Sequence, residues 1–232
     1  MPKIIESGNG TLLPRVNNIA VSRRRFLGYG AAAAVLAVGV SACDKNNNDV
    51  MPSEGADLGS GDFGILNYAY ALEQLEAAFY AKVITSPYGS IPAAELALLT
   101  DIRDHEIAHR EFFKNALGSN AIAGLTPDFS KIDFTSRASV LGTAKAFEDL
   151  GVAAYNGAGK LITNPAYLII AGKIVSVEAR HAAYIRDLIS NGSFAADLDA
   201  NGLDKSMEPS AVLTIANTFL VTKVSGKNLP TT

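Results

Sequence analysis

Two Glu-x-x-His motifs constrain the fold of this chain more than any other feature. The chain has three histidines, and two of them, His109 and His181, each follow a glutamate by three residues. The two glutamates are Glu106 and Glu178. Residues three apart share a face of an α-helix, so each motif directs a carboxylate and an imidazole to one side. In both segments that side is also the apolar one, which predicts that these polar groups are buried.

A helical period of apolar residues begins at about residue 62 and predicts four long helices. They cover residues 63–84, 93–117, 138–163 and 167–190. Short links after the first and third helices indicate two antiparallel hairpins. The connection 118–137 has no helical period and, at about 3.3 Å per extended residue, can span a bundle. We therefore predict an all-α four-helix bundle at 62–191, made of two hairpins joined by a long crossover. A C-terminal extension at 192–232 should pack on it and contain a short helix.

The two predicted hairpins repeat each other in sequence. The corresponding residues of the second and fourth helices are Ile102 and Ile174, Glu106 and Glu178, His109 and His181, and Phe113 and Ile185. In the first helix Glu73 precedes Tyr80 by the same spacing as Glu148 precedes Tyr155 in the third. Both tyrosines are expected in the core, where each could donate a hydrogen bond to a carboxylate. Two copies of one hairpin would place two equivalent half-sites face to face.

At least four glutamates and two imidazoles thus enter the predicted core. A buried carboxylate without a partner costs on the order of several kcal/mol. The arginines on these helices are expected to point away from the apolar faces: Arg103, Arg110, Arg180 and Arg186. Two divalent cations would neutralise four carboxylates. Imidazole nitrogen combined with carboxylate oxygen suits iron, manganese or zinc rather than calcium or magnesium.

Two glutamates of the first helix compete for one place in this site. Glu73 precedes a tyrosine by seven residues, as Glu148 does in the third helix, which favours Glu73. Glu76 lies nearer the middle of the apolar face, and its spacing to the next helix's motif is also repeated in the second hairpin, which favours Glu76. Both stay candidates, with a slight preference for Glu73. His105 is expected at the edge of the core.

Four stretches, in order, resemble the bacterial ferritin-like domain family, whose members often carry twin-arginine export signals. They are LEQLEAAFY (72–80), HEIAH (105–109), FEDLGVAAYNGA (147–158) and EARHAAYI (178–185). A glutamate from one helix and Glu-x-x-His from the next, given twice, is the dinuclear carboxylate pattern of the ferritin-like superfamily. The resemblance covers about residues 62–222 and implies two iron ions, with manganese as the alternative. The ligands that it implies are Glu106, His109, Glu148, Glu178, His181 and either Glu73 or Glu76.

The first 42 residues have the composition of an export signal. They carry five basic side chains and one acidic one, whereas the remainder has 15 basic and 22 acidic side chains. The acidic remainder argues against nucleic acid as a partner. SRRRFL (22–27) resembles the twin-arginine signal, and the uncharged stretch 26–42 fits its apolar core. VSAC resembles a lipobox and ends at the chain's only cysteine, Cys43.

From these segments we predict a twin-arginine lipoprotein signal at 1–42, lipidation of Cys43 and a flexible tether at 43–61. The chain would then be exported and held by its lipid on a membrane of the bacterial envelope.

An acidic stretch, residues 197–208, follows the spacing of a calcium-binding EF-hand loop. Asp197, Asp199 and Asn201 occupy ligand positions, and Glu208 ends the loop. However, the position that is apolar in such loops is Asp204. We therefore expect a polar turn here rather than a calcium site.

The expected function is oxidation chemistry at two iron ions, either oxidation of Fe2+ or consumption of O2 or peroxide. One alternative is a manganese-catalase-like peroxide dismutase. The other is an envelope protein that keeps the bundle for binding or structure and has no turnover. The sequence names no organic substrate, and a second copy of the chain, as a homodimer, is a candidate partner.

Overall fold

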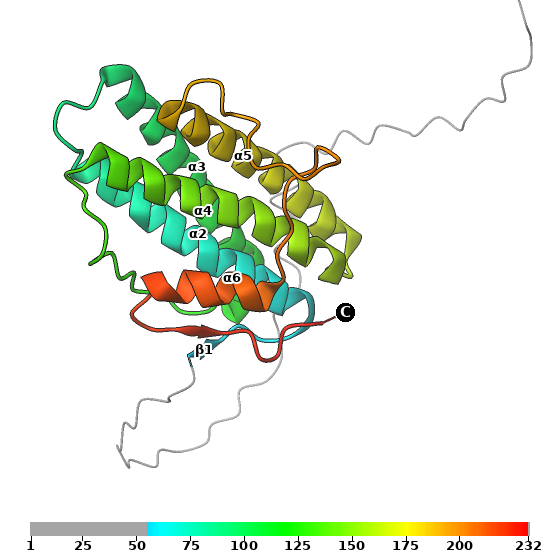
Figure 1. The fold of residues 1–232 in the computed structure, drawn as a ribbon. Coiled ribbons are helices and arrows are strands. Elements are labelled where there is room, and N and C mark those ends of the chain that lie inside the picture. Colours follow the sequence, from blue (N-terminus) through cyan, green and yellow to red (C-terminus); the bar gives the residue numbers. More distant parts are fainter. Residues whose placement is uncertain (1–54, 232) are drawn as a thin grey trace, which may run out of the picture. The chain divides into compact units, whose positions relative to one another are not determined.

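Four long helices make up most of residues 55–231, the part of the chain that the computed structural model describes (Figure 1). Their bounds are α2 Gly61–Thr85, α3 Ala93–Leu117, α4 Arg137–Ala158 and α5 Pro165–Ile189. Helix α2 packs along α3, and α4 packs along α5, with a long connection between the two hairpins. The predicted all-α four-helix bundle is confirmed. The third helix ends earlier than predicted, because the chain continues from Ala158 as a 3-10 turn, Gly159–Leu161.

Side chains before the first turns determine where α4 and α5 begin. Ser136 caps α4 by accepting a hydrogen bond from the N–H of Ser139 at 3.3 Å. Asn164 caps α5 by accepting one from the N–H of Ala166 at 2.9 Å. Pro165 follows in the first turn, where a missing N–H has no helical acceptor to lose. These caps set the register of the two helices that carry the second copy of the site residues.

Two polar side chains of α2 hold the crossover against the bundle. The buried Asn67 donates to the carbonyls of Leu58 at 3.1 Å and Asn120 at 2.9 Å. Its oxygen accepts from the N–H of Ile122 at 3.0 Å. Two turns further on, Gln74 accepts from another N–H of the crossover at 2.8 Å. Helix α2 is therefore covered on several sides, and nearly all of its residues are buried.

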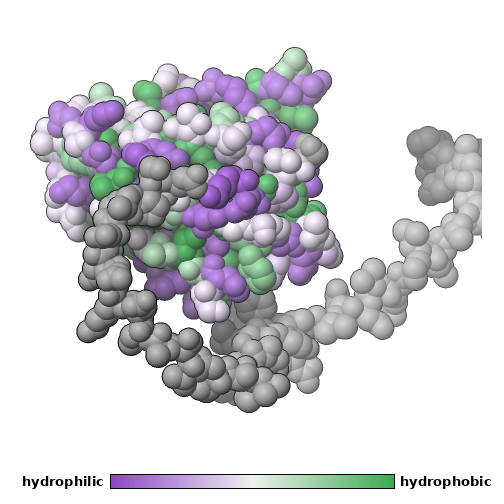
Figure 2. Space-filling model, turned by 90° about the horizontal axis from the view of Figure 1, so that it is seen from below, coloured by the Kyte–Doolittle hydropathy of each residue, from purple (hydrophilic) through white to green (hydrophobic). Residues whose placement is uncertain are grey.

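The C-terminal extension packs on α4 through the short helix α6, Pro209–Ala216. The N–H of Met207 donates to a backbone carbonyl of α4 at 3.0 Å. This close approach requires Gly157, because a Cβ at that position would overlap the Met207 carbonyl. Phe219 packs edge-on against Phe147 of α4, with 4.8 Å between the ring centroids. Figure 2 looks from the side on which α6 lies in Figure 1, and hydrophilic and hydrophobic residues are interspersed there.

A pair of two-residue strands joins the beginning and the end of the described chain. Strand β1, Ala56–Asp57, pairs in parallel with β2, Val224–Ser225. The last residues of the predicted tether at 43–61 are therefore fixed rather than flexible. The signal at 1–42, Cys43 and the rest of the tether lie outside the described residues. Within residues 55–231 no helix combines the length and the apolar character needed to cross a membrane.

Candidate metal centre

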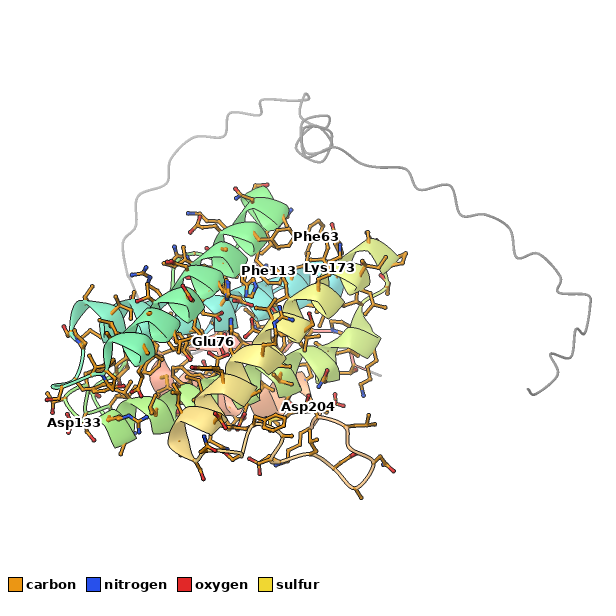
Figure 3. All side chains as sticks on the ribbon, turned by 90° about the horizontal axis from the view of Figure 1, so that it is seen from above. Phe63, Glu76, Phe113, Asp133, Lys173 and Asp204 are labelled. Carbon is orange, nitrogen blue, oxygen red and sulfur yellow. The ribbon has the colours of Figure 1, made fainter. Side chains whose placement is uncertain are left out.

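The side chains of the two motifs and of the repeat meet in the middle of the bundle. The residues are Glu73 on α2, Glu106 and His109 on α3, Glu148 on α4, and Glu178 and His181 on α5. The four glutamates are fully buried, His181 is buried, and the His109 side chain is 14% exposed. Glu76, one turn beyond Glu73, lies between the helices in Figure 3, whereas Asp133 and Asp204 lie in loops at the periphery.

These side chains form two groups, each of which could hold a metal ion. The first half-site consists of Glu73, Glu106, His109 and Glu178, and the second of Glu148, Glu106, Glu178 and His181. Within each group the candidate ligand atoms lie within 4.8 Å of one another. A cation with bonds of about 2.1 Å keeps its ligand atoms roughly 3 to 4 Å apart, so both groups have a suitable size.

Glu106 and Glu178 belong to both half-sites because each presents one oxygen to each histidine. Glu106 Oε1 lies 2.8 Å from His181 Nδ1, and its Oε2 lies 3.7 Å from His109 Nδ1. Glu178 does the reverse, with Oε1 2.9 Å from His109 Nδ1 and Oε2 3.9 Å from His181 Nδ1. Each of these two carboxylates could therefore contribute a ligand atom to both half-sites.

Most of these ligand atoms are buried and make no hydrogen bond of good geometry within the described residues. They are Glu73 Oε2, both oxygens of Glu106, Glu148 Oε2, both oxygens of Glu178, His109 Nδ1 and His181 Nδ1. Native proteins satisfy nearly all of their buried polar groups, so such a cluster calls for a ligand from outside the chain. Cations at the two half-sites would contact every one of these atoms. The buried group can therefore hold metal.

Glu73 and Glu148 each belong to one half-site only and are called the outer carboxylates here. Each accepts a hydrogen bond from a tyrosine of the opposite hairpin. Tyr155 on α4 donates to Glu73 Oε1 on α2 at 2.5 Å. Tyr80 on α2 donates to Glu148 Oε1 on α4, also at 2.5 Å. In both glutamates the second oxygen remains directed to its half-site. Glu73 and Glu148 thus each accept a hydrogen bond from a tyrosine of the other hairpin, and they occupy corresponding positions in the two half-sites. The geometry therefore favours Glu73 over Glu76 as a ligand.

Glu76 is a fifth buried carboxylate that belongs to neither group. The corresponding position of α4 in the repeat is Gly151. A Cβ there would lie 3.1 Å from Glu76 Oε1 and 3.7 Å from Glu178 Oε2, so the glycine leaves room for both side chains. Burial raises the pKa of Glu76 well above its usual range, and the charges of the surrounding glutamates raise it further. Its surroundings therefore favour the protonated form of this carboxyl, and two divalent cations would balance the charges of the other four.

When no cation is bound, the histidines and glutamates of this cluster shift one another's pKa values. Burial disfavours an imidazolium, but the neighbouring carboxylates outweigh it and raise the pKa of His109 to about 12 and that of His181 to about 10. Burial raises the pKa of Glu73 to about 7 and that of Glu178 well above its usual range. Glu106 is also buried, yet the two histidines lower its pKa to about 2. An entering metal ion must displace protons from the imidazoles.

His105, which sequence reasoning placed at the edge of the core, contacts the site directly. Its Nδ1 lies 2.9 Å from His181 Nε2, and the two rings stack with centroids 5.1 Å apart. His181 thus faces the carboxylates with one nitrogen and His105 with the other. The corresponding position on α5 is Val177, so the repeat offers His109 no such partner. The only signal in the sequence was the place of His105 directly before Glu106.

The acidic loop at 197–208 lies apart from this centre. Asp197 forms an ion pair with Lys145 at 3.0 Å. Asp199 accepts hydrogen bonds from the N–H groups of Asn201 and Leu203, each at 2.8 Å. These carboxylates already have partners within the chain. That the loop binds no calcium stays a prediction.

Arg186 differs from the prediction that the arginines avoid the interior. It is buried, and its Nη2 lies 2.6 Å from Asp149 Oδ1. Arg103 and Arg110 each pair with the acidic residue that follows them. In the described part of the chain no ion pair joins an arginine to a glutamate of the two half-sites, so no arginine neutralises these carboxylates.

Comparison with known proteins agrees with this geometry. The sequence pattern of a family described as ferritin-like domain matches residues 61–191. The matched region runs from the start of α2 to just past the end of α5 and contains every residue of both half-sites. A comparison with curated proteins finds no match. Since the matched region is more than half of the chain, the resemblance is confirmed, and the chain belongs to the ferritin-like domain family.

Proposed function

We propose that the two half-sites bind two transition-metal ions, with iron as the first choice, and that the centre oxidises Fe2+ or consumes O2 or peroxide. The observation that carries this proposal is the convergence of buried atoms that lack a well-formed hydrogen bond on two groups that share Glu106 and Glu178. Two divalent cations balance the four carboxylates of these groups. Imidazole nitrogen with carboxylate oxygen suits iron and manganese, and facing helices of ferritin-like bundles hold such pairs of ions.

Two bound Fe2+ ions would supply two electrons, which with two protons convert O2 to H2O2, or H2O2 to two H2O. The chain's own residues prepare the place for this chemistry. His109 and His181 would bind through Nδ1, and the burial of the carboxylates keeps bulk water away. The tyrosines fix the orientation of the outer carboxylates. Burial favours the protonated form of Glu76, which lies beside these ligands.

Metal analysis after growth with ample iron and manganese tests the proposal. We expect about two ions per chain, together with consumption of O2 or H2O2 by the iron-loaded protein. Glu106→Gln should lower the metal content, while Glu111→Gln, a substitution at the surface of the same helix, should leave it unchanged. Less than one ion per native chain would contradict the proposal and favour the alternative of an envelope protein that keeps the bundle for binding or structure without turnover. Manganese with disproportionation of H2O2, and no oxidation of Fe2+, would support the manganese-catalase-like alternative.

We also propose that the chain is exported by the twin-arginine route and anchored by a lipid on Cys43. The support comes from SRRRFL and from a lipobox that ends at the chain's only cysteine. Changing Arg23 and Arg24 to lysine should keep the precursor in the cytoplasm. Cys43→Ala should instead release exported protein from membranes, as fractionation would show. Normal export of the double-lysine variant would exclude the twin-arginine route.

A further inference from the structure

An apolar cavity of about 50 Å3 lies between the helices next to the first half-site, with the exposed Ala116 and the half-buried Phe112 at its outer side. All four long helices contribute to its wall, and every residue that lines it is apolar or aromatic. The lining residues that matter here are Ala69, Leu72, Phe113, Ala116, Ala154 and Tyr155. Figure 3 labels Phe113 on α3. Protein interiors are close-packed, so a void of this size beside a charged cluster requires a reason.

The cavity adjoins the first half-site through shared residues. The ring of Tyr155 lines the cavity, while its hydroxyl donates to Glu73 Oε1 at 2.5 Å. Leu72 is the chain neighbour of Glu73, and Phe113 lies one turn beyond His109 on α3. A molecule in the cavity would therefore contact the ring of the tyrosine whose hydroxyl holds Glu73 of the first half-site.

Beside the second half-site, bulkier residues occupy the positions that correspond to the cavity wall. The repeat matches Ala154 with Phe79, and Leu72 with Phe147. Phe79 and Phe147 are buried and pack edge-on, with 5.2 Å between their ring centroids. The same chain thus fills this place with phenylalanine in one half and leaves it open with alanine in the other. The cavity is a local departure from the repeat rather than a consequence of it.

The size and the polarity of the cavity select its ligand. One water molecule needs roughly 10–15 Å3 of such volume, so about 50 Å3 admits a diatomic molecule. Organic ligands occupy pockets of roughly 300–1,000 Å3, which are far larger. Apolar cavities stay dry and take up apolar gases such as xenon. Fe2+ and H2O2 both lose hydration on entering, and the lining offers neither a charge nor an array of hydrogen bonds in return.

We propose that this cavity is the dioxygen site of the protein and that O2 reaches the metal centre at the Glu73/His109 half-site. The inference rests on the proposed function, since it names O2 rather than peroxide as the oxidant and names the half-site that O2 meets first. Cations must then enter elsewhere.

Xenon binding to the metal-free protein tests the cavity without any turnover. Crystals under xenon pressure, or xenon-induced shifts of methyl signals in NMR, should place xenon against Ala69, Leu72 and Ala154. Ala154→Leu should remove that site by filling it. Ala146→Leu is the matched control, because Ala146 lies on the same helix but lines a separate hollow beside Asp149. An empty cavity in the wild-type protein under xenon would overturn the proposal.

Kinetics of the iron-loaded protein test the oxidant. Ala154→Leu should raise the KM for O2 several-fold and leave oxidation of Fe2+ by added H2O2 unchanged. Ala116→Phe should act in the same way without a change in the packed core, because Ala116 is an exposed residue of the cavity wall. Equal slowing with both oxidants, or an unchanged KM for O2, would contradict the proposal. Failure of the metal centre itself would appear separately, as a low metal content in the presence of a normal xenon site.

Discussion

The two half-sites have the same kinds of ligand but different surroundings. Each combines one imidazole, one outer glutamate held by a tyrosine, and the shared pair Glu106 and Glu178. The first half-site borders an apolar cavity, whereas the second is enclosed by phenylalanines and has His105 behind its imidazole. The repeat thus accounts for the candidate ligands, while residues about one turn away do not follow the repeat and would determine access. Two ions bound here would be equivalent in coordination but not in reactivity.

Removing either imidazole should have the largest effect. His109→Ala and His181→Ala should each reduce the metal content from about two ions to about one, because each half-site has one imidazole. The ion left in His181→Ala lies beside the cavity, so O2 should oxidise it faster than the ion left in His109→Ala. Metal analysis and stopped-flow oxidation of Fe2+ would measure both effects. Equal oxidation rates would mean that the surroundings of the half-sites do not control access.

Replacing each of the two glutamates of α2 separately should show which of them is a metal ligand. Glu73→Gln should lower metal content, whereas Glu76→Gln should keep both ions. Glu76→Gln should also raise the Tm of the metal-free protein by about 2–4 °C, because Glu76 takes up a proton on folding and glutamine needs none. Calorimetry with metal analysis would show this difference. Equal metal loss in both variants would show that Glu76 is also a metal ligand.

The stability of the metal-free protein should decrease as the pH rises. Folding raises the pKa of His109 to about 12 and that of His181 to about 10. Their stabilisation is complete below the usual imidazole pKa of about 6.5 and is lost as pH rises toward the folded values. The raised pKa of Glu73, about 7, acts in the same direction.

The Tm of the metal-free protein should therefore fall between about pH 6 and pH 9. The gain in Tm on adding Mn2+ should grow over the same range, because binding releases protons. Thermal scans with and without Mn2+ would measure both trends. A metal-free Tm that rises with pH would show that protons do not hold the cluster.

Removing His105 should have the smallest effect and should act on one half-site alone. His105→Ala should weaken binding of one of the two ions about tenfold, because it removes the partner of His181 Nε2. His105→Gln, which keeps a hydrogen-bonding group, should restore part of the affinity. Val177→Ala, at the corresponding position of the repeat, should leave both affinities unchanged. Titration with Mn2+ would resolve the two sites, and equal weakening of both would argue against a role confined to His181.

The bundle and most of the candidate ligands could be predicted because they follow from helical periodicity. Glu-x-x-His on an apolar face specifies both the direction of the side chains and their burial. The choice between Glu73 and Glu76 could not be made in this way, because both lie on the inner side of one helix. The deciding contact comes from Tyr155 on α4, which is distant in the sequence.

Other features could not be predicted from the sequence, because they depend on single long-range contacts that leave no periodic pattern. The pairing of Ala56–Asp57 with Val224–Ser225 involves strands too short to show an alternating pattern. Arg186 is buried because Asp149 of the neighbouring helix compensates its charge. The cavity arises where Ala154 replaces a phenylalanine of the repeat, and an alanine by itself does not indicate whether neighbours fill the space.

Neither hairpin contains a complete half-site. The first half-site takes Glu178 from α5, and the second takes Glu106 from α3. Metal could therefore be held only after the two hairpins have docked, and the protein would acquire it in the compartment where it folds. A chain that crosses the membrane already folded, as the proposed twin-arginine route requires, would take its metal from the cytoplasm and carry it outside. A chain that crosses unfolded would depend on whichever metals are present beyond the membrane.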